Sequence, residues 1–187
     1  MAASKKDVCH FGIECKKMNT SQIDAILSSK CDLSTKYAGT FACDHLPRAV
    51  DKPAALVVNT DPAHMPGTHW VCIYIENDRG EYFDSYGLPP TGDYFTNFLR
   101  NNCKKWIWNK KQLQSLDSTV CGQWCISFLT ARGRGEGMEK FQQKFCENLE
   151  KNDSKISHFD KIETAAKILD QSCRSSHHGN NAANICR

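Results

Sequence analysis

The sequence predicts an α+β fold in which a small mixed sheet lies between helices. Two short runs of aliphatic, β-branched and aromatic residues, at 54–59 and 70–76, are typical of buried strands. Apolar residues across 93–102 recur with the spacing of one helix face, which indicates an amphipathic helix. Together these elements outline a sheet that is covered by helices.

The first half of the chain is expected to contain one helix and several extended segments. Residues 19–21 (Asn-Thr-Ser) offer an N-cap for a helix over residues 22–28. The segments expected after it are a turn into an extended segment at 37–41, a strand at 54–59, a loop with two prolines at 60–68 and a strand at 70–76.

A hairpin is expected to follow the second strand. Asn77-Asp78-Arg79-Gly80 is a run of turn formers, and residues 81–85 have the composition of a return strand. Glycines and prolines at 87–92 break the pattern before the amphipathic helix. The remaining expected elements are a strand at 106–108, a second strand before Gln114, and helices at 121–131, 136–150 and 159–169.

The length of 187 residues fits one domain with tails. We expect a flexible or variable lead at residues 1–18, a single domain over 19–172 and a disordered tail at 173–187. Cysteines and histidines in that tail match no standard zinc-finger spacing, so no metal site is expected.

The composition is that of an ordinary soluble protein, with 40% hydrophobic and 24% charged residues. The net charge of +3 is too small to argue for nucleic-acid binding by itself. The eleven cysteines are odd in number, and the first residues contain no apolar segment typical of a signal peptide. We therefore expect a reducing compartment, the cytosol or nucleus, and no membrane span.

Four polar residues stand in a chain order that suits thiol hydrolysis: His69, Asp84, Gln114 and Cys121. A thiol attacks as thiolate, which is favoured by a helix N-terminus and by a neighbouring imidazolium. Cys121 stands where a helix is expected to begin, and His69 directly precedes a strand. Gln114 would donate an N–H to the developing oxyanion beside the Cys121 backbone N–H.

Asp84 is the candidate that orients the imidazole. The expected hairpin places His69 and Asp84 nearly opposite each other, although their positions require a small offset or a bulge. Each of the four residues taken singly has an ordinary structural explanation. Their order, the hairpin and the expected helix start favour a shared catalytic role.

These residues resemble the adenovirus-type maturation proteases (adenains), in the group that includes the SUMO-deconjugating proteases. The resemblance covers residues 20–131 and rests on His69-Trp70, Phe83-Asp84-Ser85-Tyr86-Gly87 and Cys121-Gly122-Gln123-Trp124-Cys125. Gln114 precedes Cys121 by seven residues, as in adenains, whereas Asp84 stands where adenains have glutamate. Similar proteases occur in Polinton/Maverick-type transposons and related viruses.

The resemblance implies an adenain-like fold and a thiol endopeptidase that cleaves virion or capsid precursor proteins after small or Gly-Gly-type sequences. It implies a triad of Cys121, His69 and Asp84 with Gln114 in the oxyanion hole, and the chemistry itself needs no cofactor. It also implies an activating peptide joined through a disulfide to Cys103, with DNA as a second activator. The expected location is the virion and the host nucleus or cytoplasm.

Three alternatives remain open at this point. The same chemistry would serve an isopeptidase that removes SUMO or another ubiquitin-like modifier. A chymotrypsin-like viral cysteine protease shares the order His, acid, Cys, but its fold is all-β. A protein without catalytic activity, acting as a binding module or a DNA-binding accessory protein, is the third.

Overall fold

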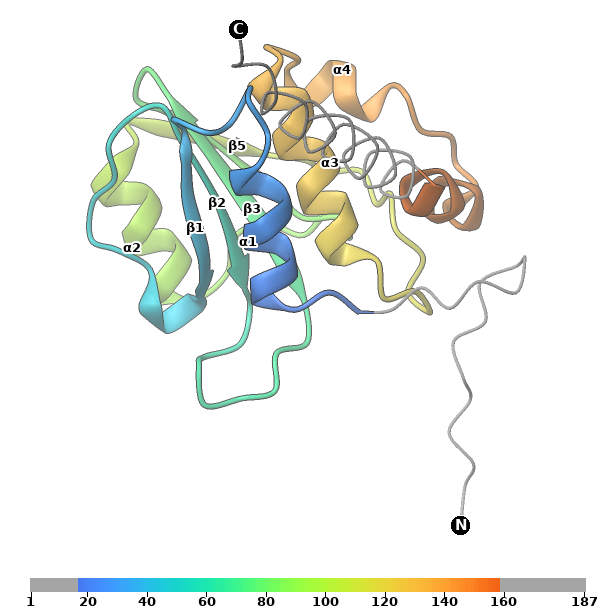
Figure 1. Ribbon diagram of the computed structural model, residues 1–187, viewed down its shortest axis with the longest axis horizontal. Helices are drawn as coiled ribbons and strands as arrows, with labels where there is room; N and C mark the ends of the chain where they lie inside the picture. Colours follow the sequence, from blue (N-terminus) through green and yellow to red (C-terminus); the bar gives the residue numbers. More distant parts are fainter. Residues whose placement is uncertain (1–16, 159–187) are drawn as a thin grey trace, which may run out of the picture.

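A five-stranded mixed sheet forms the centre of the computed structural model, which describes residues 17–158 (Figure 1). Each strand pairs in the sheet with the strand that follows it in the sequence. The strands are β1 (Tyr37–Ala42), β2 (Ala54–Asn59), β3 (Trp70–Glu76), β4 (Arg79–Phe83) and β5 (Lys105–Trp108). The two outer pairs, β1–β2 and β4–β5, are parallel, and the two inner pairs are antiparallel. The predicted α+β class is confirmed.

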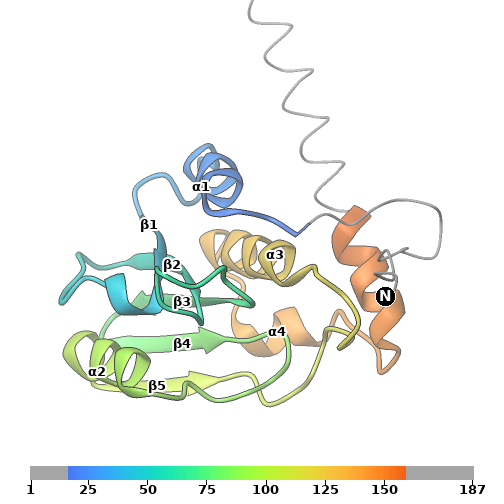
Figure 2. The same ribbon diagram turned by 90° about the horizontal axis from the view of Figure 1, so that it is seen from below.

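Helices cover both faces of the sheet. The helical elements are α1 (Thr20–Ser28), the 3₁₀ turn η1 (Cys43–His45), α2 (Asp93–Asn102), α3 (Cys121–Gly133) and α4 (Met138–Gln142), and residues 149–158 are also helical. The helices α1, α3 and α4 pack on one face, and α2 and η1 pack on the other (Figures 1 and 2). Within the described residues no helix has both the length and the apolar character that a bilayer crossing requires.

The central strands are apolar on both sides because both faces of the sheet are covered. In β3, Cys72 and Tyr74 face α3, whereas Val71, Ile73 and Ile75 face α2. This explains why the strands 54–59 and 70–76 are continuous apolar runs rather than alternating ones, and both have the predicted bounds.

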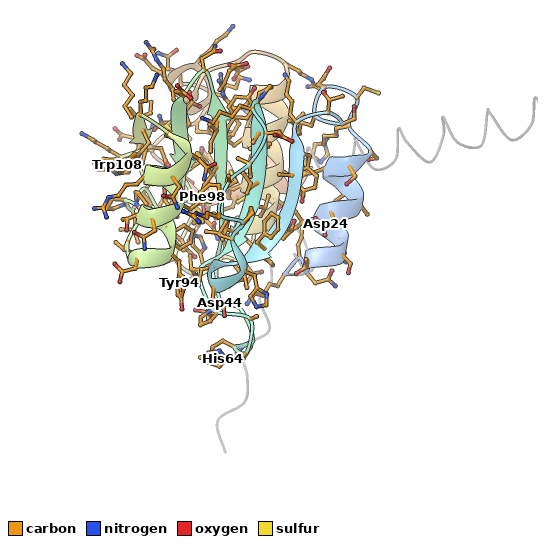
Figure 3. The ribbon with its side chains drawn as sticks, turned by 90° about the vertical axis from the view of Figure 1, so that its left-hand side faces the viewer. Asp24, Asp44, His64, Tyr94, Phe98 and Trp108 are labelled. Atoms are coloured by element: carbon orange, nitrogen blue, oxygen red, sulfur yellow. The ribbon has the colours of Figure 1, made fainter. Side chains whose placement is uncertain are left out.

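The first helix begins close to the predicted cap. The side chain of Asn19 accepts a hydrogen bond from the Gln22 N–H at 3.0 Å, and the Gln22 side chain accepts one from the Asn19 N–H. This reciprocal pair is a capping box, which satisfies two N–H groups that the helix leaves without partners. In α2, Phe95, Phe98 and Leu99 are buried as predicted, but Tyr94 is exposed (Figure 3).

The turn between β3 and β4 is shorter than predicted. It consists of Asn77 and Asp78, which have φ angles of 50° and 61°. Both residue types tolerate this left-handed backbone, which a tight two-residue hairpin requires. The return strand therefore begins at Arg79 and ends at Phe83, rather than spanning 81–85.

Two further expectations are wrong. Residues 109–120 contain no strand, because the N–H groups of Leu113 and Gln114 both bond to the carbonyl of Ser85 and turn the chain into a loop. The helix expected at 136–150 is interrupted after Gln142. The side chain of Asn148 accepts from the Lys151 N–H and thereby caps a new helix, while Phe145 packs on the Trp124 ring.

Parts of the expected organisation fall outside the described residues. These parts are the helix at 159–169, the tail at 173–187 with its cysteines and histidines, and residues 1–16 of the lead. Of the lead, Lys17 and Met18 are described, and the Met18 carbonyl accepts a hydrogen bond from the Trp70 indole at 3.0 Å.

An aromatic cluster on the α3 face of the sheet is expected to carry much of the stability; its members are Phe83, Trp124, Phe128, Phe141 and Phe145. The ring of Phe83 is fully buried and stacks on Phe128 at a centroid distance of 4.5 Å. Phe83→Ala should lower the free energy of unfolding by about 3–5 kcal/mol, through lost burial and the cavity left behind. Denaturant unfolding measures this, with the exposed Tyr94→Ala as a control that should change stability by about 0.5 kcal/mol or less. A Phe83→Ala loss as small as the control's would show that the cluster does not carry this stability.

Candidate active site

The candidate residues gather at one end of the sheet. His69 directly precedes β3, and Asp84 directly follows β4. Because these strands are antiparallel, the start of one lies beside the end of the other. The helix α3 begins with Cys121 at this same end, from which the loop between β2 and β3 projects, with His64 near its tip (Figures 1 and 3).

His69 and Asp84 are hydrogen-bonded. The distance from His69 Nε2 to Asp84 Oδ1 is 2.8 Å, and the Asp84 side chain is buried. The same oxygen accepts the backbone N–H of Tyr86 at 2.8 Å. A carboxylate only accepts, so the proton of this bond is on Nε2, which leaves Nδ1 for a second partner.

The strand register explains how this contact forms. The ladder pairs Cys72 with Phe83 without any irregularity between β3 and β4, so the bulge considered above is absent. Continued past the strand ends, this register places His69 opposite Tyr86 rather than opposite Asp84. The His69 and Tyr86 rings do stack, at a centroid distance of 4.6 Å and an interplanar angle of 24°. Asp84 therefore reaches His69 as a diagonal neighbour.

Cys121 completes the group. It is the first residue of α3 and is only 3% exposed. Burial by itself lowers the pKa of His69, but hydrogen bonds with Asp84 and Cys121, and the negative charge of both groups, outweigh it and raise this pKa to about 9. At neutral pH the ring is therefore an imidazolium that lies between a carboxylate and a sulfur.

Gln114 is fully buried and firmly held. Its Oε1 accepts the Ser85 hydroxyl at 2.6 Å, and its Nε2 donates to the Ser118 carbonyl at 3.0 Å. A backbone carbonyl only accepts, so the amide nitrogen must face Ser118. The second hydrogen of Nε2 points toward the Tyr86 hydroxyl at 3.5 Å, which is a long contact.

Cys103 lies elsewhere in the fold. It caps the C-terminus of α2 and belongs to the apolar cluster on the α2 face, whereas Cys121 belongs to the cluster on the α3 face. Its sulfur packs so closely on Gly80 that a Cβ there would lie 2.7 Å away. Burial raises the pKa of the Cys103 thiol, with a smaller opposing effect of Lys52. The structure thus brings four of the five candidate residues together and leaves Cys103 apart.

Three residues to which the sequence assigned no role support the site. Tyr86 stacks on the imidazole, and Ser85 holds the Gln114 amide. Asn109, which directly follows β5, accepts the Asp84 N–H at 2.8 Å and donates to the Asp84 carbonyl at 2.5 Å. Since β4 and β5 are parallel, this side chain continues the ladder one residue beyond the strands and fixes the backbone of Asp84.

A cavity of about 390 Å³ lies beside the site, where β1 and β2 end and β3 begins. Met18, Gly67 and Trp70 are among the residues that line it. Met18 also lies against the residue after Cys121, because a Cβ on Gly122 would approach the Met18 Cβ to 3.1 Å. The cavity thus borders Trp70, which follows His69, and Met18, which contacts the residue that follows Cys121.

No protein-family model matches the chain, and no curated protein matches its sequence. The chain is similar to the crystal structure of the ASFV pS273R protease, with a TM-score of 0.54 and 18% identity over 74% of this chain and 65% of that one. It also matches ChlaDub1 from Chlamydia trachomatis, with a TM-score of 0.46 and 16% identity over 86% and 89% of the two chains.

The likeness to the ASFV protease shows that the chain shares its fold, although the chain spans only about 65% of that protein's length. The helix that begins at Cys121 and the α+β architecture exclude the all-β chymotrypsin-like alternative.

Proposed function

We propose that this protein is a cysteine endopeptidase in which Cys121 attacks the substrate carbonyl and His69 transfers protons. Asp84 orients the imidazole, and Gln114 stabilises the oxyanion. The observation that carries the proposal is the position of His69, which bonds to Asp84 through Nε2 and interacts with Cys121 as its second partner.

The geometry supports a two-step reaction. The Cys121 thiolate forms a C–S bond with the carbonyl carbon, and the negative charge on the oxygen is met by Gln114 Nε2–H and the Cys121 backbone N–H. The imidazolium gives its proton to the leaving amine as the C–N bond breaks. Neutral His69 then takes a proton from water, which attacks the thioester. Release of the acid restores the thiolate and the imidazolium.

The burial of the site supports a preference for slender substrates. Cys121 is almost inaccessible and the His69 side chain is only 13% exposed, so bulky side chains next to the scissile bond would be excluded. This agrees with cleavage after small or Gly-Gly-type sequences. The sequence resemblance to adenains supports virion precursor proteins as the natural substrates.

An isopeptidase acting on a ubiquitin-like modifier is the second candidate. A folded modifier needs a docking surface around the site in addition to a narrow channel. Three large apolar side chains are exposed on the loops that carry or adjoin His69, Asp84 and Gln114: Met65, Leu88 and Leu116. Rapid labelling of Cys121 by a modifier with a C-terminal aldehyde would favour this candidate.

Activation by a disulfide-linked peptide and by DNA is also part of the proposal, on the basis of the resemblance to adenains. Lys52 and Lys104 pair with Asp78 near Cys103, so basic side chains do lie close to that thiol. Because the thiol is covered by Gly80, formation of a disulfide would require a local opening of this region. Cys103→Ser should abolish any activation by a thiol peptide while leaving basal hydrolysis unchanged.

A peptide-library cleavage profile tests the proposed function. The profile is measured with and without a thiol blocker, and again with added DNA. We expect internal cleavage after small residues, complete loss with the blocker, and a faster rate with DNA if DNA is an activator. Cleavage that persists after the thiols are blocked would refute the proposed mechanism.

The raised pKa of His69 predicts the alkaline limit of activity. Hydrolysis needs the imidazolium for the leaving amine, so kcat/KM should fall as pH rises through about 9. Asp84→Asn removes a charge that raises this pKa, so the alkaline limb of the kcat/KM–pH profile should move to lower pH. Because protonation of His69 is favoured in the folded state, it also raises the free energy of unfolding. This contribution is fully present below pH 6.5 and is lost as the pH rises through about 9. An unchanged limb in Asp84→Asn would contradict the assigned role of Asp84.

A further inference from the structure

Three consecutive residues after β4 serve the two halves of the site. Asp84 bonds to His69, and the Tyr86 ring stacks on His69. Between them, Ser85 is almost fully buried, and its hydroxyl donates to Gln114 Oε1 at 2.6 Å. The Ser85 carbonyl also accepts the N–H groups of Leu113 and Gln114, at 2.8 and 3.0 Å, so the backbone of Gln114 is tied to the same residue.

We infer that Ser85 is a positioning residue that holds the Gln114 amide so that one N–H of Nε2 faces the developing oxyanion. This inference rests on the proposed function. The amide has two fixed ends, because the Ser85 hydroxyl holds Oε1 and the Ser118 carbonyl holds one hydrogen of Nε2. Among the described residues, the remaining hydrogen has only the long 3.5 Å contact with Tyr86, which a substrate oxyanion can replace.

The orientation of this amide determines whether it helps or hinders the reaction. With Nε2 forward, the amide donates to the oxyanion, but with Oε1 forward it would present a negative dipole end to it. Without the Ser85 hydroxyl, Oε1 would be a buried acceptor without a partner and would rotate toward another donor. Ser85 therefore acts on the transition state through Gln114, without touching the substrate.

Ser85→Ala tests this inference by steady-state kinetics on a cleaved peptide. We expect kcat to fall about 10- to 100-fold with KM nearly unchanged. This loss is smaller than the loss on removing an oxyanion donor outright, because the Gln114 amide is still present but no longer held in place. In a Gln114→Ala background the same substitution should have no further effect, since the residue it positions is absent. Ser85→Thr, which keeps the hydroxyl, should restore most of kcat. The exposed Ser154→Ala is the matched control and should leave kcat unchanged.

The rate of Cys121 alkylation by iodoacetamide separates positioning from a general structural role. Alkylation needs the thiolate beside His69 but no oxyanion donor, so the rate should be the same in Ser85→Ala and in the unmodified protein. The inference is overturned if kcat is retained in Ser85→Ala, or if alkylation slows in parallel with kcat. It is also overturned if Ser85→Ala lowers kcat as much in the Gln114→Ala background as in the unmodified protein. Failure of the unmodified protein to hydrolyse any peptide would instead overturn the proposed function.

Discussion

Cys121→Ala is expected to lower kcat by about 10⁵- to 10⁶-fold, because it removes the sulfur that forms the covalent intermediate in the proposed mechanism. The sulfur is the only group removed, and it lies at the first residue of a long buried helix, so the fold should persist. Circular dichroism checks the fold, and hydrolysis of a peptide from the cleavage profile measures the loss.

Two other thiols provide controls for this substitution. Cys125 lies one helical turn further along α3 and is buried, whereas Cys146 is exposed. Cys125→Ala and Cys146→Ala should each keep activity within a fewfold of the unmodified protein. Full hydrolysis in Cys121→Ala would exclude thiol chemistry at this site, and a loss in Cys125→Ala alone would place the nucleophile elsewhere on the helix.

His69→Gln is expected to lower kcat by about 10⁴- to 10⁶-fold. Glutamine keeps a polar side chain of similar reach, but it cannot become a cation beside the sulfur or pass a proton to the leaving amine. Because His69 and Cys121 act as a unit, the double variant His69→Gln/Cys121→Ala should be no less active than the worse single variant.

A control for the histidine lies in the preceding loop. His64 is exposed and lies near the tip of the projecting loop (Figure 3), so His64→Gln should leave kcat unchanged. If His69→Gln retained activity within about tenfold, proton transfer by this imidazole would not be part of the rate-limiting chemistry.

The sequence predicted the central strands well because their signal is local. The runs at 54–59 and 70–76 are apolar throughout, and α3 starts at Cys121 as expected. The hairpin turn was misjudged, because four turn-forming residues in a row do not reveal that only Asn77 and Asp78 have positive φ. The interrupted helix after Gln142 depends on a cap by Asn148, a residue type that also occurs within helices.

The candidate site could be predicted in its residues but not in its connections. His69 and Asp84 are close because of the strand register, and a shift of that register changes which residue lies opposite the imidazole. The roles of Ser85, Tyr86 and Asn109 were missed because they depend on side chains that are distant in sequence. Their burial or contacts become visible only once β4, β5 and the loop to α3 are placed together.

The reactivity of individual thiols at neutral pH tests the central claim most directly. Mass spectrometry after limited treatment with iodoacetamide gives the alkylation rate of each cysteine. We predict that Cys121, although buried, reacts at least about tenfold faster than the exposed Cys31 and Cys146, and that His69→Gln removes this advantage. Faster reaction of the exposed thiols, or a Cys121 rate that is unchanged in His69→Gln, would contradict an imidazolium-activated nucleophile.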